Sequence, residues 1–138
     1  MNADAYFAIG KTHTVCQDYA LGIASPCMAV LSDGCSSSPH TDYGARLLSR
    51  LAVLHGVQEA VFRAVPLVEP LALPTSCLNA TLMLAKWDDT MKSVRVEVAG
   101  DGVVLARRRD GGSPTIITSE FPSGAPRYPS YDLDPAMR

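Results

Sequence analysis

Apolar and polar residues alternate most clearly between residues 93 and 99. Val94, Val96 and Val98 are separated there by single polar residues, a pattern typical of a strand with one buried face. Shorter apolar stretches, bounded by glycine, proline or small polar residues, predict further strands. They lie at residues 5–9, 19–24, 27–31, 79–87, 103–108 and 115–119.

Two Asp-Gly pairs follow the alternating stretch. Asp101-Gly102 and Asp110-Gly111 both predict hairpin turns, because this dipeptide readily adopts the positive φ angles that tight β-turns require. They bracket residues 103–108, so we expect residues 93–119 to form an antiparallel meander.

A helical pattern begins near residue 42. Thr41 or Asp42 can cap its first turn, and Gly56 either ends the helix or weakens it. Residues 65–74 contain three prolines and predict a connector. The order of strands, helix, connector and strands favours an α+β fold with antiparallel sheet. The apolar residues at helical spacing are Leu47, Leu51, Leu54, Val57 and Val61.

The composition is that of an ordinary globular protein. Of the 138 residues, 47% are hydrophobic and 19% are charged, which excludes a disordered chain, and the length suits a single domain. A net charge of −2 argues against nucleic acid or an anionic membrane as the main partner. No apolar run approaches the roughly 20 residues that cross a bilayer, so we expect no membrane partner.

The four cysteines indicate a reducing compartment. Cys16, Cys27, Cys35 and Cys77 form no CxxC pair and lack a zinc-type spacing to the histidines. Free thiols are usual in the cytoplasm. The first ten residues carry an acid and no basic region before an apolar run, so we expect no signal peptide and a cytoplasmic location.

Candidate chemistry lies at the ends of two predicted strands. Asp33 and Gly34 follow the apolar stretch 27–31. There a carboxylate and an uncovered carbonyl could offer hard oxygen ligands to Mg²⁺ or Mn²⁺. The alternative for this pair is an ordinary strand-terminating turn. Asp18 heads the stretch 19–24, and pairing of the two strands would bring it near Asp33. The alternative for Asp18 is an exposed strand start.

Three elements in this order resemble the metal-dependent protein phosphatases of type 2C. They are GKTHTVCQDYALG, then AVLSDGCSSS with DYGARLLSRLA, then NATLMLAKW with RVEVAGDGVVLARR. The likeness is closest to the bacterial branch, in which a histidine precedes a CQD element. It covers most of the chain from Ile9 to Arg109 and includes the segment SGAPRYPSY.

The resemblance implies a sandwich of antiparallel sheets flanked by helices. It also implies a pair of Mn²⁺ or Mg²⁺ ions that support hydrolysis of phosphoserine and phosphothreonine in a phosphoprotein substrate. By position, Asp33 would bridge the ions and the Gly34 carbonyl would bind one of them. Asp18 would hold a coordinated water, and Asp101 would support an accessory ion or the local turn. His13 could donate to phosphate, act as a general acid, or serve the loop structurally.

The sequence also departs from the family pattern. His13 stands where many relatives carry a phosphate-binding arginine, and small polar residues replace glycines after Asp33. Cys35 in that loop is either a reactive thiol or inert packing. Two further aspartates of the family site have no counterpart after Asp101, so we expect residues 1–138 to form one incomplete phosphatase-like domain that is weak or inactive alone.

The sequence also allows two alternatives to a phosphatase. The first is a non-catalytic phosphatase-like module that binds a partner protein or a phosphorylated segment. The second is a homo-oligomer in which another copy covers exposed sheet edges and apolar surface.

Overall fold

The computed structural model describes residues 2–122 and 126–134. Within them the chain forms six strands, two α-helices and three short 3-10 helices. The strands are β1 (Tyr19–Ile23), β2 (Met28–Ser32), β3 (Leu82–Asp88), β4 (Ser93–Ala99), β5 (Gly102–Ala106) and β6 (Thr115–Ser119). The helices are α1 (Thr41–His55), α2 (Val57–Val68), η1 (Glu69–Leu71), η2 (Thr75–Leu78) and η3 (Pro129–Leu133).

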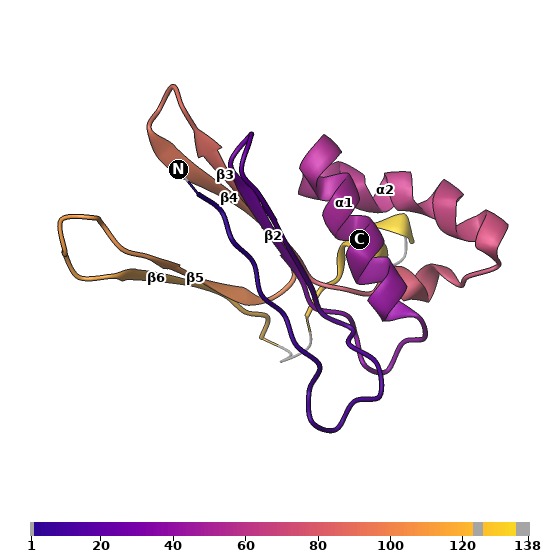
Figure 1. Cartoon of the computed structure of the whole chain (residues 1–138). Coiled ribbons are helices and arrows are strands. Elements are labelled where there is room, and N and C mark those ends of the chain that lie inside the picture. The colour runs from indigo at the N-terminus through magenta and orange to yellow at the C-terminus, as the bar shows by residue number, and fades with distance from the viewer. Residues whose placement is uncertain (1, 123–125, 135–138) are drawn as a thin grey trace.

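The first four strands form one antiparallel sheet in the order β1-β2-β3-β4. Both α-helices lie on the same face of this sheet (Figure 1), and β5 pairs with β6 in a separate antiparallel hairpin. The chain is therefore an α+β protein with antiparallel sheets, as the order of elements in the sequence predicts.

The core lies between the helices and the sheet. Alternate residues of the strands, such as Val30 and Leu84, are buried against apolar residues of α1 and α2, such as Leu48 and Val61. Val30 pairs with Leu84, so both side chains stand on the helix-covered face. The remaining buried members include Met28, Ala45, Ala52, Val57, Ala60, Ala64, Val68, Cys77, Leu78, Ala80 and Leu82.

The start of α1 differs from the capping that the sequence predicts. His40 occupies the N-cap position in a left-handed conformation, and no side-chain cap is formed. Thr41 is buried instead, and its hydroxyl donates to the Cys35 carbonyl oxygen at 3.1 Å. The prediction of a Thr41 or Asp42 cap was wrong, because the first turn is anchored to the loop before it.

Gly56 ends α1, which settles the choice that the sequence left open. Its φ of +87° breaks the helix, and α2 begins at once with Val57. The Val57 amide donates to a carboxylate oxygen of Glu97 at 3.1 Å, so a residue of β4 satisfies one of the unpaired donors at the start of α2. No helix in residues 2–122 or 126–134 combines the length and apolar character needed to cross a membrane.

The structure differs from two elements that the sequence predicts, the strand at residues 5–9 and the connector at residues 65–74. Residues 5–9 form no strand and run irregularly beside β1, where the Phe7 ring lies 5.2 Å from that of Tyr19. The predicted connector at residues 65–74 begins too early, because α2 continues to Val68 and accommodates Pro66. Val65 and Val68, in the last turn of α2, pack against the core, and this packing outweighs the poor helix propensity of proline.

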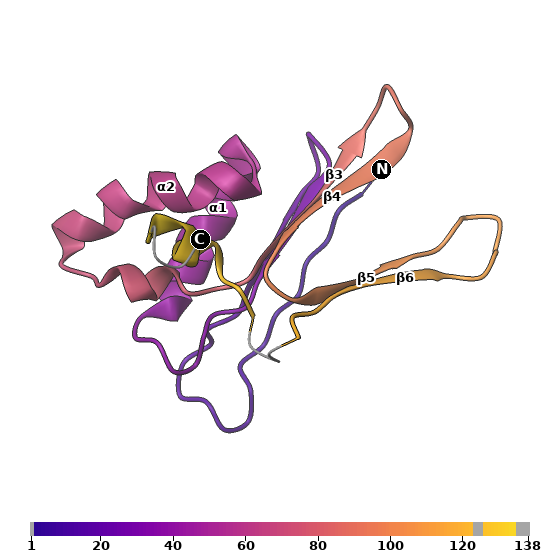
Figure 2. The same ribbon diagram turned by 180° about the vertical axis from the view of Figure 1, so that it is seen from behind.

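The β5–β6 hairpin, here called the arm (residues 102–119), stands away from the four-stranded sheet (Figure 2). The turn at Asp110-Gly111 lies between its strands as predicted, with Gly111 at a φ of +86°. The hairpin predicted at Asp101-Gly102 was wrong, because β4 pairs with β3 and β5 pairs only with β6. Asp101 therefore lies at the junction between the sheet and the arm.

Candidate metal centre

Asp18 and Asp33 lie side by side at one edge of the sheet. Tyr19 of β1 pairs with Ser32 of β2, so the residue before the first strand faces the residue after the second. Asp18 lies within hydrogen-bonding reach of the Asp33 carboxyl. Strand pairing thus brings together the two acids, as the sequence predicts.

The electrostatics of Asp33 reflect this crowding. The residue is exposed on the wall of a cavity, yet surrounding protein atoms partly desolvate its carboxyl. This desolvation, followed by the hydrogen bond and charge of Asp18 and the charge of Asp101, raises the pKa of Asp33 from 3.8 to about 6. His13 acts in the opposite direction, since a nearby positive charge favours the carboxylate.

The acids share a cavity of about 430 Å³. The junction residue Asp101 and the loop residue His13 both line it, together with Gly34. Asp101 and His13 are exposed, whereas Asp18 is half-buried. The structure therefore brings three segments of the sequence to one opening, with His13 and Asp18 in the first, Asp33 and Gly34 in the second, and Asp101 in the third.

Gly34 lies where its carbonyl is not used by the neighbouring strand. It faces Ala80 in an isolated antiparallel bridge, and the two bonds that close the bridge run from Cys35 to Asn79 and from Thr81 to Asp33. In such a pair the peptide groups of the central residue point away from its partner. A Cβ at Gly34 would stand 2.7 Å from the Gln17 carbonyl oxygen, so the close approach of the two segments requires glycine.

Thr81 fixes the backbone beneath the acids. Its hydroxyl accepts a hydrogen bond from the Asp33 amide at 3.2 Å, and its carbonyl accepts one from the Ser32 hydroxyl at 2.7 Å. Its side chain also fills the space that a Cβ on Gly100 would occupy. Sequence reasoning missed Thr81, since a threonine at a strand start carries no chemical signature.

Cys35 lines the same cavity as a polarised thiol. Partial burial alone would raise its pKa, but hydrogen bonds with Ser37, Tyr128 and Ser38 outweigh that effect and lower the pKa to about 7. Burial and the interaction with Cys35 raise the pKa of the Tyr128 phenol in turn. Of the two alternatives for Cys35, this environment favours a reactive thiol over inert packing.

The loop that carries Cys35 is linked by hydrogen bonds to the last described segment. The side-chain nitrogen of Asn79 donates to the Ser38 hydroxyl at 3.0 Å, and the side-chain oxygen of Asn79 accepts from the Ser130 hydroxyl at 2.6 Å. Asn79 therefore joins the loop after β2 to η3, the element that follows Tyr128. The sequence gives no signal for this role, because the contact joins residues 51 positions apart.

The donor set fits a hydrated hard cation and does not fit a fully enclosed one. Asp18 and Asp33 supply adjacent carboxylates, and Gly34 supplies a carbonyl, which are the ligand types that Mg²⁺ and Mn²⁺ prefer. Among residues 2–122 and 126–134, no group of three or more His, Cys, Asp or Glu side chains converges closely enough to hold an ion alone. Mg²⁺ usually retains several waters, so a site of this kind needs few protein ligands.

Comparisons with models of protein families, with curated proteins and with solved structures found no match for this chain.

Proposed function

We propose that this chain is a phosphatase-like domain of type 2C that binds Mn²⁺ or Mg²⁺ at Asp18, Asp33 and Gly34. The observation that carries the proposal is that three carboxyl groups, from three separate segments, line one cavity, with two of them adjacent. Desolvation, followed by the hydrogen bond and charge of Asp18 and the charge of Asp101, raises the pKa of Asp33. A divalent cation would relieve the repulsion among these carboxylates. The sandwich fold implied by the family resemblance belongs to the same proposal.

The proposed reaction is hydrolysis of a phosphoserine or phosphothreonine ester. A bound Mn²⁺ or Mg²⁺ would lower the pKa of a coordinated water and neutralise charge on the phosphoryl oxygens. Asp33 and the Gly34 carbonyl would hold the cation, while Asp18 would orient water beside it. His13, exposed on the cavity wall, would donate to a phosphoryl oxygen or protonate the leaving oxygen. Asp101 would hold an accessory cation at the junction with the arm.

Titration calorimetry with Mn²⁺ and phosphate release from a phosphothreonine peptide test the two parts separately. We expect saturable Mn²⁺ binding by the wild type and slow, manganese-dependent phosphate release. Asp33→Asn should abolish both, and Asp18→Asn should reduce release by about 10–100-fold. Asp110→Asn is the matched control, because it removes an exposed aspartate of the arm turn. Undiminished turnover in Asp33→Asn would contradict the proposed role of that carboxylate.

A non-catalytic module is the second candidate. It is favoured by the small donor set, since no three-residue group of ligating side chains occurs in the described part of the chain. This candidate predicts that the wild type binds the phosphothreonine peptide without releasing phosphate at any Mn²⁺ concentration. Manganese-dependent release that is lost in Asp33→Asn would exclude it.

A further inference from the structure

The outer face of the four-stranded sheet, opposite the helices, is apolar and only partly covered. The pairing of β3 with β4 places Met83 with Val98, Ala85 with Val96 and Trp87 with Val94 on this face. Val94, near the end of β4 that adjoins the β3–β4 turn, is 54% exposed. The N-terminal segment covers part of the face at β1, where Ala3 and Asp4 lie against Gly22. Further along, Tyr6 lines a hollow together with Met83 and Val103.

The arm is apolar on both of its faces. Leu105 pairs with Ile116 on one face, and these side chains are 62% and 61% exposed. Val104 pairs with Ile117 on the other. No charged side chain occurs within β5 or β6. Strands that are apolar on both faces are typical of positions between two layers, so a free arm is unfavourable in water.

The accessible surface of the chain is larger than that of a compact protein of the same mass. A compact monomer of 14.7 kDa exposes about 6,900 Å², whereas this chain exposes 8889 Å². The excess is roughly 2,000 Å², more than twice the approximately 800 Å² that each partner contributes to a stable interface. The chain therefore exposes enough surface to form a stable interface with a second copy.

We propose that two copies of this chain clasp one another, each arm inserting between the arm and the outer sheet face of its partner. Figure 1 shows the arm diverging from the outer face of the sheet, with the N-terminal segment running between them. A two-fold arrangement gives every arm two apolar neighbours, the partner's sheet on one side and the partner's arm on the other. Because both contacts are reciprocal, the assembly closes at two copies.

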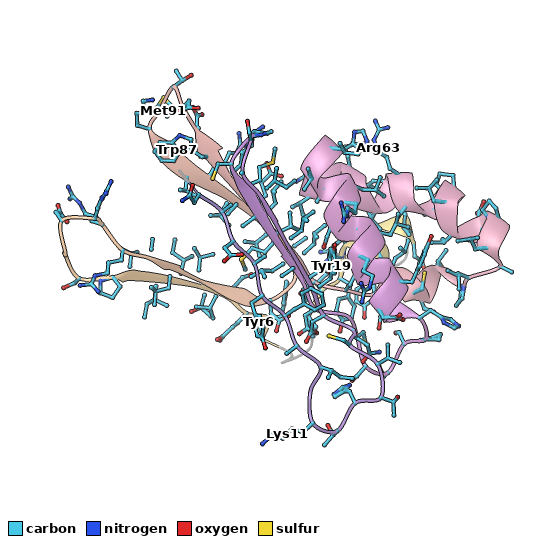
Figure 3. All side chains as sticks on the ribbon, viewed as in Figure 1. Tyr6, Lys11, Tyr19, Arg63, Trp87 and Met91 are labelled. Carbon is cyan, nitrogen blue, oxygen red and sulfur yellow. The ribbon has the colours of Figure 1, made fainter. Side chains whose placement is uncertain are left out.

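Trp87 provides an internal reporter of this assembly. It is the single tryptophan of the sequence, and it lies on the outer face of β3 toward the far end of the sheet (Figure 3). Burial by a partner's arm would shift its fluorescence emission to shorter wavelength. We expect dilution of the wild type to reverse this shift in parallel with a fall in mass from twice 14.7 kDa to 14.7 kDa.

Paired substitutions identify the surfaces. Leu105→Lys with Ile116→Lys alters only the arm, and Val94→Lys with Val98→Lys alters only the sheet. Each double variant should raise the dissociation constant by about 100-fold or more, because the new charges would be buried without partners. Leu54→Lys is the control, since Leu54 is 70% exposed on α1 and lies outside the proposed interface. Circular dichroism of each variant verifies that the helices and the sheet are retained.

Mixing the arm variant with the sheet variant tests the reciprocal geometry. The mixed pair contains one intact contact, that of an unaltered arm with an unaltered sheet, so association should be partly restored. Light scattering and Trp87 emission report it. A wild type that stays monomeric at high concentration, open-ended aggregates, full dimerisation by both variants, or variants that fail to associate on mixing would each overturn the clasp.

Discussion

Replacing Asp33 by asparagine should stabilise the metal-free protein at pH 7.5. The pKa of Asp33 is raised from 3.8 to about 6 by desolvation, by Asp18 and by Asp101. The native state therefore binds this proton more tightly than the unfolded chain does, so ionisation of Asp33 destabilises the fold. The cost appears as the pH rises above about 4 and is complete above about 6.

The expected gain follows from the size of the pKa shift. A shift of about two units corresponds to roughly 3 kcal/mol as an upper limit. Because Asp33 is exposed on the cavity wall, solvent screening reduces this figure, and we expect about 1 kcal/mol. With a slope of about 2 kcal/mol per molar urea, the unfolding midpoint of Asp33→Asn should lie about 0.5 M higher in EDTA.

Urea unfolding at several pH values measures this gain. The two proteins should differ by about 1 kcal/mol at pH 7.5 and hardly at all at pH 4. Asp110→Asn is the control, because its side-chain oxygen can still accept the hydrogen bond of the Gly112 amide. Equal or lower stability of Asp33→Asn at pH 7.5 would refute the reasoning. Added Mn²⁺ should then stabilise only the wild type, since ligands that bind the native state raise its stability.

Two further substitutions test contacts of the helices, and one modification tests the thiol that lines the cavity. Gly44→Ala should destabilise the protein by about 3 kcal/mol or more in urea unfolding, because the added Cβ would overlap the Cys77 carbonyl oxygen. Glu97→Ala should lower the free energy of unfolding by about 1 kcal/mol, because it removes the acceptor of the Val57 amide. Glu97→Gln keeps a side-chain oxygen and should retain most of that stability. The rate of Cys35 alkylation by iodoacetamide should rise through a midpoint near pH 7, while buried Cys77 stays slow; a midpoint above pH 8.5 for Cys35 would contradict its lowered pKa.

The sheet was predictable wherever local pattern and long-range packing agree. The alternating valines of β4 and the Asp-Gly turn of the arm both appear where the sequence places them. The turn at Asp101 was not predictable, because the dipeptide permits a hairpin and only tertiary pairing decides that β4 joins β3. Residues 5–9 have strand composition but lie beside β1 without pairing to it, for the same reason.

Part of the candidate site could also be predicted. Asp18 and Asp33 follow from antiparallel pairing, since the residues that flank paired strand ends must lie close together. Thr81, Asn79 and Tyr128 could not be found this way. Their contacts come from segments distant in sequence, and neither their residue type nor their spacing marks them.

The location of Asp101 links the geometry of the acid cluster to the position of the arm. Gly100, at a φ of +102°, and Gly102 flank Asp101, so the third carboxyl group lies at the junction between the sheet and the arm. A rotation of the arm about this junction would move Asp101 relative to Asp18 and Asp33, which lie at the ends of paired strands. In the proposed clasp a second molecule would hold the hairpin, so protein concentration would tune the affinity of the proposed metal site for a divalent ion.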